Sequence, residues 1–430
     1  DGVIVAVGKA DELRRRYPDF EPSGGASCVV HPGLVNTHAH LTVDRLLRSA
    51  IPDDLPPGES IFSWAVPAHE EVTAEDDELS ALLALVDAQR HGVTTVLDAG
   101  TVAHPAAVAD AMQQAGERGF VGTWGWDAEG VPFGGTVEEV LARQSAVLDR
   151  WPSNDPAALV RGAVTLVGHD LVSDELLAAG VALAAEHDTL CTFHISPHDR
   201  DAAAYLARTG RRPLVHFEAI GALGSRVVLA HAVHLDGEEL EAALRTDTAI
   251  ASCPLAYLRL GQGYARHARH ADFLARGGRL GLGSDSENAG DSMDLLRVAA
   301  TFAGLSKDLA LDPTRSGAHE ALELLTIGGA RALGLDRVIG SLEPGKRGDV
   351  VVHRTDHPAW QPMSPDPILA LVWSAQGATV DDVVIDGRVV VRNGRSTWID
   401  EDHLTSRARV AGAALAERAG LPVASRWPIE

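Results

Sequence analysis

The feature that most constrains the fold is a repeated alternation of short apolar runs with Ala- and Leu-rich segments at helical spacing. This alternation is typical of consecutive β–α units, and eight such units in about 250–300 residues fit one closed barrel. We expect helices at 76–91, 104–118, 136–150, 173–186 and 237–245. The expected strands lie near residues 33–39, 93–98, 120–126, 161–168, 189–195, 226–231, 248–252 and 279–284.

Several of these strands end on side chains that bind metal ions. The first leads into His38-Ala39-His40, and residues two apart on a strand project from the same face. The other strands concerned close on His194, His231 and Asp285. Because all strands of a parallel barrel end at one rim, these side chains would converge there. Histidines with one aspartate make a plausible site for a divalent metal.

The two ends of the chain follow a different pattern. Residues 2–8, 348–352 and 383–391 are Val-rich runs with nearby glycines, which predicts hairpin strands. We therefore expect an α/β fold in which a (β/α)8 TIM barrel of residues 31–337 is flanked by a small β-sandwich domain. That domain would be built from residues 1–30 and 338–430, and an amphipathic helix is expected at 401–419.

Five segments spread over nearly the whole chain carry a family resemblance. They are Pro32-Gly33-Leu34-Val35-Asn36-Thr37-His38-Ala39-His40, Gly92-Val93-Thr94-Thr95-Val96-Leu97-Asp98, Leu229-Ala230-His231-Ala232-Val233-His234-Leu235, Gly281-Leu282-Gly283-Ser284-Asp285 and Gly340-Ser341-Leu342-Glu343-Pro344-Gly345-Lys346-Arg347-Gly348-Asp349. With them the chain resembles the amidohydrolase superfamily, in the branch of cytosine and guanine deaminases and triazine hydrolases. The resemblance also implies that strands normally preceding Asp1-Gly2 are absent from this sequence.

The resemblance assigns roles to the residues at the strand ends. It implies that one divalent metal, with zinc expected and iron(II) or manganese as alternatives, is held by His38, His40, His194 and Asp285. Asp285 would also take a proton from the attacking water, and His231 would stabilise the oxyanion of the tetrahedral intermediate. The implied reaction is hydrolytic displacement of an amino group from a small nitrogen heterocycle of the purine, pyrimidine or triazine type.

One position departs from the pattern of that branch. A glutamate that shuttles protons usually stands three residues after the third metal histidine, and here the position is occupied by Pro197. His198 or Asp199 could substitute, since an imidazole with a pKa near 6.5 can carry protons. Both could equally be solvated loop residues. A leaving group that needs less protonation, such as chloride, would tolerate the loss.

Other residues near strand ends are candidates for substrate contacts. Trp124 and Trp126, with Trp64 and Phe62, could form an aromatic wall for a flat ring, although such residues are more often packing. His169 and His234 could face the site or belong to the surface. Glu287 and Asn288, with Asp291, follow Asp285 in a loop that could reach the pocket or be merely solvated. For Cys253 a buried structural thiol is favoured over a nucleophile.

Composition limits the partners. The 37 Lys and Arg against 60 Asp and Glu give a net charge of −23, which disfavours nucleic acid and anionic membranes. No apolar run reaches the roughly 18 residues needed to span a bilayer. Only three cysteines occur, which favours a reducing compartment. We expect a cytoplasmic protein with a small heterocyclic substrate, and a homo-oligomer is expected only from the resemblance.

Two other functions stay open at this point. The same site could hydrolyse a cyclic amide or a carbon–halogen bond. Alternatively, the loss of the glutamate could indicate a non-catalytic descendant that binds a ligand in the old pocket. The complete set of metal ligands argues against the second alternative, because a retired site has no physical reason to keep so many polar groups at one rim.

Overall fold

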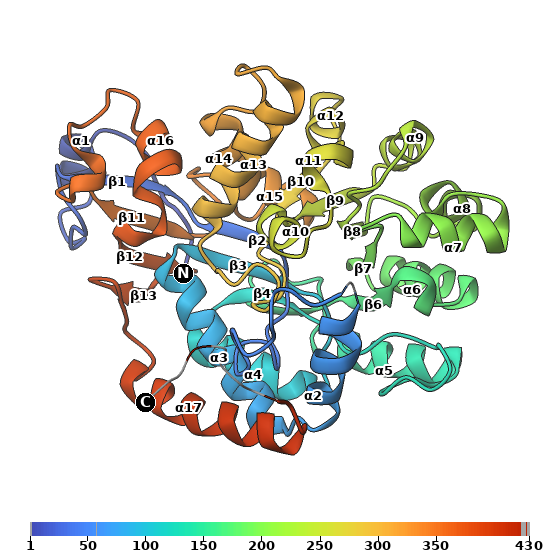
Figure 1. Ribbon diagram of the computed structural model, residues 1–430. Coiled ribbons are helices and arrows are strands. Elements are labelled where there is room, and N and C mark those ends of the chain that lie inside the picture. The colour runs from blue at the N-terminus through green and yellow to red at the C-terminus, as the bar shows by residue number, and fades with distance from the viewer. Residues whose placement is uncertain (1, 57, 423–426, 428–430) are drawn as a thin grey trace.

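The predicted eight-stranded parallel barrel is present in the computed structural model, which describes residues 2–56, 58–422 and 427 (Figure 1). Two parallel sheets have the orders β2–β3–β4–β5 and β10–β9–β8–β7–β6. They join where only Ala163 separates β5 from β6, and where a parallel bridge pairs Ala39 with Asp285. The strands are β2 (Leu34–Ala39), β3 (Val93–Asp98), β4 (Arg118–Val121), β5 (Val160–Gly162), β6 (Val164–Gly168), β7 (Cys191–Ile195), β8 (Val227–His231), β9 (Ala249–Ser252) and β10 (Leu280–Leu282). The fourth expected strand is therefore split, and the third begins and ends earlier than expected.

The five expected helices of the barrel are confirmed, and three of them begin with a capping box. Thr73 with Asp76, Thr136 with Glu139 and Asp236 with Glu239 satisfy the free N–H groups of α3 (Ala74–Arg90), α5 (Val137–Arg150) and α9 (Gly237–Arg245). The other two are α4 (Pro105–Ala115) and α6 (Asp174–Glu186). Further helices are η1 (Ser60–Ala65), α2 (Val66–Glu70), η2 (His169–Leu171), α7 (Arg200–Thr209), α8 (Pro213–Ala219), α10 (Pro254–Arg259), α11 (Tyr264–His267), α12 (His270–Ala275), α13 (Leu295–Ala310), α14 (Ala318–Leu325) and α15 (Ile327–Ala332).

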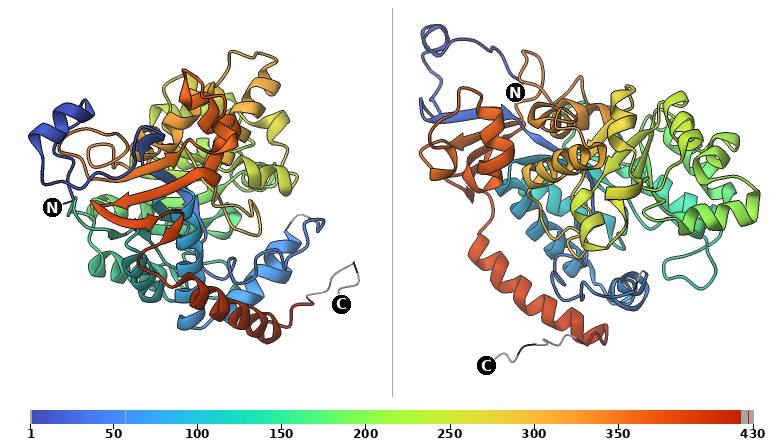
Figure 2. Two further views of the ribbon diagram at one scale, coloured as in Figure 1. Left: turned by 90° about the vertical axis from the view of Figure 1, so that its left-hand side faces the viewer. Right: turned by 45° about the horizontal axis from the view of Figure 1, so that its top comes forward.

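A second, antiparallel sheet flanks the barrel and uses both ends of the chain (Figure 2). Its order is β1–β11–β12–β13–β14, so the N-terminal strand pairs with a strand more than 300 residues later. The expected final helix is confirmed as α17 (Glu401–Arg418), which packs along α3. The remaining elements are β1 (Cys28–Pro32), β11 (Val350–Arg354), β12 (Val380–Ile385), β13 (Arg388–Arg392), β14 (Arg395–Ser396), α1 (Ala10–Arg16), η3 (Pro358–Trp360), α16 (Pro367–Ala370), η4 (Leu371–Ala375) and η5 (Gln376–Thr379).

The expected hairpin strand at residues 2–8 is wrong. This segment makes one isolated bridge, from Val3 to Arg347, and Ile4 exchanges backbone hydrogen bonds with the 345–346 turn. Val5 and Val7 remain more than half exposed, so the segment has no partner surface that would stabilise a longer strand. The boundaries of the two predicted domains stay a prediction, and their outermost parts, residue 1 and residues 423–426 and 428–430, lie outside the described residues.

The barrel and the flanking sheet meet at a buried polar seam. Arg118, at the start of β4, donates two hydrogen bonds to Asp349 at 2.8 and 3.0 Å, and both side chains are almost fully buried. Gly33 connects β1 to β2 and donates its N–H to the Asp349 carbonyl. A Cβ at this position would lie 2.0 Å from the hydroxyl oxygen of Thr94, so only glycine fits. The seam therefore fixes the position at which β2 begins, and so the position of His38 on that strand.

Within the described residues, no helix is both long and apolar enough to cross a membrane.

Candidate active site

Four histidines and one aspartate meet at the carboxyl end of the barrel strands, as the sequence predicted. His38 Nε2 and His40 Nε2 each lie 3.6 Å from Asp285 Oδ1, and His231 Nδ1 lies 3.9 Å from Asp285 Oδ2. His194 Nε2 is 3.3 Å from His40 Nε2. The ring centroid of His38 lies 4.9–5.3 Å from those of the other three histidines. Strands β2, β7, β8 and β10 thus bring together residues up to 247 positions apart in one small volume.

Hydrogen bonds outside the cluster orient two of the imidazoles. His194 Nδ1 donates to the carbonyl of Val167 at 2.7 Å, so its Nε2 carries the lone pair that faces the cluster. His40 Nδ1 lies 2.8 Å from the hydroxyl of Thr101, which follows β3. Sequence reasoning missed Thr101 because no spacing rule connects it to His40.

The charge state of the cluster suits a cation. Burial lowers the pKa of His40 to about 4 and that of His231 to about 3, and it also holds the pKa of His194 well below its usual value. Burial alone would raise the pKa of Asp285, but the neighbouring histidines hold it below its ordinary range. The imidazoles of His40, His194 and His231 are therefore neutral, the Asp285 carboxylate is ionised, and these groups can act as ligands.

Unpartnered nitrogen atoms test whether a metal fits here. Both ring nitrogens of His38 and Nδ1 of His231 are buried without a hydrogen-bond partner among the described residues. Leaving such groups without a partner in an apolar interior costs free energy, and a metal ion bound to one ring nitrogen of His38 would satisfy that nitrogen. The ligand atoms of His38, His40 and His194 lie within 4.8 Å of one another, as do those of His38, His231 and Asp285. The residues present fit a divalent metal.

Backbone strain accompanies the cluster. His231 and Asp285 have φ values of +75° and +64°, in the left-handed region that residues other than glycine rarely adopt. The backbone N–H of Asp285 donates to the His38 carbonyl at 3.0 Å, which holds the turn after β10 against β2. Such strain persists only where the surroundings impose it, and it concentrates at functional sites.

The residues around Pro197 lie at the edge of the cluster. Pro197 is buried, His198 is half-buried and Asp199 is exposed. The pKa of His198 is lowered, chiefly by burial, and its Nδ1 is buried with no hydrogen-bond partner in the described part of the chain. Asp199 precedes α7 but makes no capping hydrogen bond. Of the two proposed substitutes for the glutamate, only His198 is therefore placed inward.

His169 lies closer to the metal ligands than the sequence indicated. Its ring stacks on that of His194 with centroids 5.8 Å apart and an interplanar angle of 19°. Its Nδ1 is bonded to Asp201 at 2.8 Å. Asp201 was missed, because it lies inside an amphipathic helix where a charged residue predicts nothing about chemistry.

The predicted aromatic wall is a packed stack. Trp124 stacks on Trp126 with centroids 4.9 Å apart and on Phe133 at 5.4 Å, and it meets the edge of His69 at 5.1 Å. Trp126 is held further by a 2.6 Å hydrogen bond from Nε1 to the Pro132 carbonyl. Trp124 Nε1 and His69 Nδ1 remain buried without partners among the described residues. Trp64 is buried, whereas Phe62 is half exposed.

The loop after β10 is tied to the loop after β2. Glu287 is buried against Arg45, and Asp291 accepts a 2.7 Å hydrogen bond from Arg48. Asn288 donates to both the backbone and the carboxylate of Asp44, which also accepts from the Ser286 hydroxyl. The three acidic or amide candidates therefore serve this loop connection in the present structure. Sequence reasoning missed Asp44, Arg45 and Arg48, whose partners in the loop after β10 are more than 240 residues away.

Two further candidates are engaged elsewhere. His234 Nε2 lies 2.8 Å from the Gln262 carbonyl, and its ring stacks on His267. Cys253 is fully buried, and burial holds the pKa of its thiol well above its ordinary value. A thiol that stays protonated is a poor nucleophile, which agrees with the structural role expected for Cys253.

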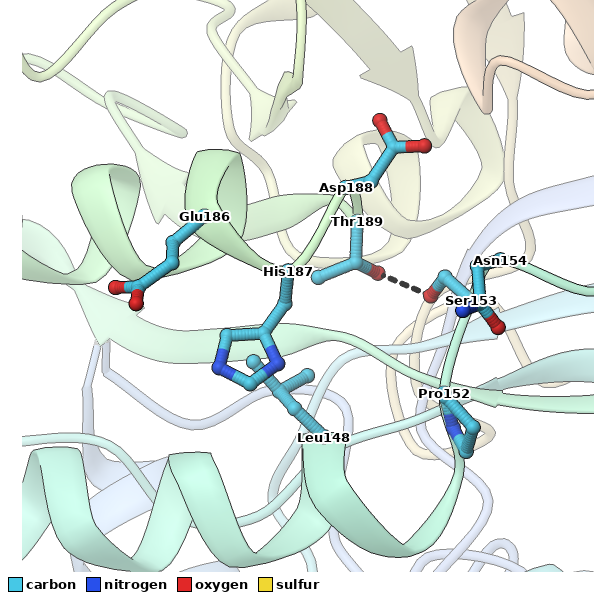
Figure 3. Close-up of a pocket in the computed structure, with 8 residues that line it drawn as sticks. All are labelled: Leu148, Pro152, Ser153, Asn154, Glu186, His187, Asp188 and Thr189. Carbon is cyan, nitrogen blue, oxygen red and sulfur yellow. Dashed lines mark hydrogen bonds between the residues drawn. The ribbon is translucent and has the colours of Figure 1, made fainter.

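A cavity of about 290 Å³ lies at the other end of the barrel and does not belong to this cluster (Figure 3). Thr189, which precedes β7, and Ser153, which precedes β5, line it and are hydrogen-bonded at 2.8 Å. Glu186 points away from the other labelled side chains. The cavity therefore lies apart from the proposed metal ligands.

Comparison with known proteins identifies the family. Residues 29–390 match the Amidohydrolase family, and residues 1–19 match a bacterial imidazolonepropionase-like composite domain. The chain is 32% identical over 409 residues to a 5-methylthioadenosine/S-adenosylhomocysteine deaminase of Syntrophobacter fumaroxidans, covering 95% of this chain and 91% of the relative. It is 30% identical over 393 residues to a 5'-deoxyadenosine deaminase of Methanothermobacter thermautotrophicus, covering 91% and 88%.

A solved structure supports the same assignment. The zinc-bound adenosine deaminase from Xanthomonas campestris matches with a TM-score of 0.89 at 27% identity, covering 97% of this chain and 92% of that one. The resemblance inferred from the motifs is thus confirmed. The chain belongs to the amidohydrolase family and is a hydrolase of C–N bonds other than peptide bonds.

Proposed function

We propose that this protein is a zinc-dependent aminohydrolase that removes the exocyclic amino group of a 6-aminopurine nucleoside. The observation that carries the proposal is the convergence of four imidazoles and one carboxylate at the strand ends. The relatives named as deaminases of adenosine derivatives support the substrate class.

His38, His40, His194 and Asp285 would hold one metal ion. When bound, such an ion lowers the pKa of water to about 7 and polarises the bond under attack. The hydrogen bond from His194 Nδ1 to Val167 keeps that imidazole in the orientation in which Nε2 serves as a ligand. The zinc bound to the Xanthomonas campestris structure supports zinc as the ion.

Asp285 and His231 would perform the proton transfer and the charge stabilisation. The ionised carboxylate of Asp285 accepts a proton from water as its oxygen attacks the ring carbon. His231, whose Nδ1 lies 3.9 Å from Asp285, donates a hydrogen bond to the oxygen on which negative charge develops. Both residues have a left-handed backbone conformation, of the kind that concentrates at functional sites.

The loop network favours an uncharged substrate. Arg45 and Arg48 lie near the barrel rim, but Glu287, Asp87 and Asp291 already engage them. These two arginines therefore offer no free positive charge to a phosphate group. This supports a nucleoside as the substrate rather than a nucleotide.

The test is a turnover assay on zinc-loaded protein with four substrate classes: aminopurine nucleosides, aminopyrimidines, chlorinated triazines and cyclic amides. Ammonia released from the aminopurine nucleosides, with a loss of several orders of magnitude in Asp285→Asn, is the expected result. Chloride release or ring opening would reassign the bond. Ligand binding without turnover of any class would indicate a non-catalytic descendant.

A cytoplasmic location and a homo-oligomeric state complete the proposal. The three cysteines are all unpaired and two are buried, which supports a reducing compartment. Fractionation of cells that express the full-length protein tests the first, and sedimentation of the purified protein tests the second.

A further inference from the structure

The loop after β7 has a proline, Pro197, where a proton-carrying side chain was expected. Hydrogen bonds in this loop place a different carboxylate, that of Asp201, beside it. Pro197 has no side-chain group that can hold a proton. Just before it, the Ser196 carbonyl accepts hydrogen bonds from the N–H groups of Val233 and His234, each at 3.0 Å. The Ser196 N–H donates to Asp201 Oδ2 at 2.5 Å. The chain turns here, with φ of +48° at Ser196, and Asp201 enters from the first turn of α7.

Asp201 forms a carboxylate–imidazole pair with His169. The same Oδ2 atom accepts a 2.8 Å hydrogen bond from His169 Nδ1. The backbone of His169 is held as well, because its carbonyl accepts from the Tyr205 hydroxyl at 3.0 Å, and its φ is +54°. A carboxylate partner of this kind fixes which imidazole nitrogen bears the proton. With Nδ1 committed to Asp201, Nε2 is the nitrogen available for other contacts.

The position of His169 suits a contact with substrate. Its ring lies parallel to that of His194, a proposed metal ligand, at 5.8 Å between centroids. It is close enough to interact electrostatically with His231 and His198 as well. The side chain is 24% exposed, so Nε2 is not sealed in the interior. Among the described residues, Nε2 makes no hydrogen bond that would occupy it.

His198 lacks these features. Asp201 interacts with it electrostatically, but within the described part of the chain its Nδ1 is buried without a partner and no carboxylate is hydrogen-bonded to its ring. An imidazole without a fixed tautomer is a poorer proton carrier than one held by a carboxylate. The paired histidine is therefore the stronger candidate for the place of the missing glutamate.

We propose that His169, positioned by Asp201, carries the proton for which the deaminase branch uses the glutamate replaced here by Pro197. This inference rests on the proposed deaminase function. In this step His169 is an imidazolium. Its Nδ1–H stays bonded to Asp201 and its Nε2–H passes to the ring nitrogen beside the reacting carbon, while water loses a proton to Asp285 and the water oxygen bonds to that carbon. The C–N bond then breaks as Asp285 returns its proton to the leaving amine, and the hydroxyl proton returns to His169. The products are the oxo heterocycle and ammonia, and both residues are regenerated.

The pair itself is tested without turnover. In ¹⁵N-histidine-labelled protein, an imidazole N–H bonded to a carboxylate gives a proton resonance downfield of the amide region. We expect one such resonance to disappear in both His169→Gln and Asp201→Asn and to persist in His187→Gln. His187 is the matched control because it lies at the opposite end of the barrel, in the cavity of Figure 3. A spectrum in which the two variants lose no common resonance would overturn the pair.

The proton role is tested by kinetics on zinc-replete protein, once the wild type has been shown to release ammonia. We expect His169→Gln to lower kcat about 10²–10⁴-fold with its zinc content unchanged. Asp201→Asn should also lower kcat, and the double variant should be no slower than His169→Gln alone, because the two act as one unit. Imidazole added to His169→Gly should restore turnover in proportion to its concentration.

Failure of the inference is distinguishable from failure of the proposed function. A wild type that turns over no aminated substrate contradicts the deaminase proposal before any variant is made. An active wild type contradicts the role of His169 if His169→Gln keeps kcat within threefold, if the two losses multiply in the double variant, or if imidazole has no effect on His169→Gly. A large loss confined to His198→Gln would instead assign the proton to His198.

Discussion

Neutralising Asp349 should destabilise the protein far more than neutralising an exposed partner with the same geometry. Arg118 and Asp349 form two hydrogen bonds at 2.8 and 3.0 Å, with side chains that are 0% and 2% exposed. In Asp349→Asn the guanidinium stays buried, and among the described residues it keeps a single ion pair, with Asp386 at 3.4 Å. Breaking one side of a buried ion pair costs about 3–5 kcal/mol, so we expect a decrease of that size in the free energy of unfolding.

Arg245 and Glu218 provide the matched control. They also form two hydrogen bonds, at 3.0 and 2.7 Å, but their side chains are 54% and 31% exposed. Solvent screening makes such a pair contribute little, so Glu218→Gln should shift the urea midpoint only slightly. The assay is urea unfolding followed by circular dichroism, with both variants measured beside the wild type.

A second variant separates charge from packing. If the cost of Asp349→Asn comes from the unpaired buried charge, then Arg118→Met combined with Asp349→Leu should recover most of the lost stability. A midpoint for Asp349→Asn that matches the one for Glu218→Gln would refute the claim that burial sets the cost. Failure of the double variant to recover stability would indicate that the geometry of the seam matters more than its charge.

Further predictions concern the turn into β2 and the effects of pH and chelation. Gly33→Ala should lower the free energy of unfolding by about 1–3 kcal/mol, because its Cβ would clash with Thr94. Gly25→Ala has open space around its Cβ and should be neutral. Equal urea midpoints for the two variants would contradict this. Burial lowers the pKa of His31 to about 4, so the stability it contributes is complete above its unfolded pKa of about 6.5 and declines by up to about 3 kcal/mol as the pH falls to 4. His31→Asn should therefore lose less stability than the wild type between about pH 6.5 and 4. Parallel curves of unfolding free energy against pH for the two proteins would contradict this prediction. Chelation of the metal should lower the melting temperature of the wild type but not that of His38→Ala/His40→Ala.

Sequence pattern was sufficient for elements whose residues carry their own periodicity. The barrel strands are apolar runs buried on both faces, as the fully buried β2, β3 and β7 illustrate, so no long-range information was needed to find them. The metal cluster followed from one topological rule, since parallel strands end at a common rim. Residues 2–8 have the composition of a strand, but they form only one isolated bridge and do not pair along a neighbouring strand. Composition alone does not reveal whether a neighbouring strand is there to pair with.

The residues that sequence reasoning missed share a different property. Asp201 becomes informative only through His169, and Asp44 only through Asn288, which lies 244 positions away. Such pairs depend on how loops pack over the rim, and no local spacing encodes that packing. Trp124 and Trp126 were rightly singled out as neighbours, yet only the structure reveals that they stack on each other and on Phe133.

The metal content of the purified protein tests the central claim most directly. Elemental analysis of wild-type protein should find about one zinc ion per chain, and His38→Ala/His40→Ala should hold none, since those two imidazoles supply half of the proposed ligands. Two ions per chain would contradict the mononuclear site. A wild type that takes up no metal when zinc is offered, or a variant that binds as much as the wild type, would contradict the proposed metal centre itself.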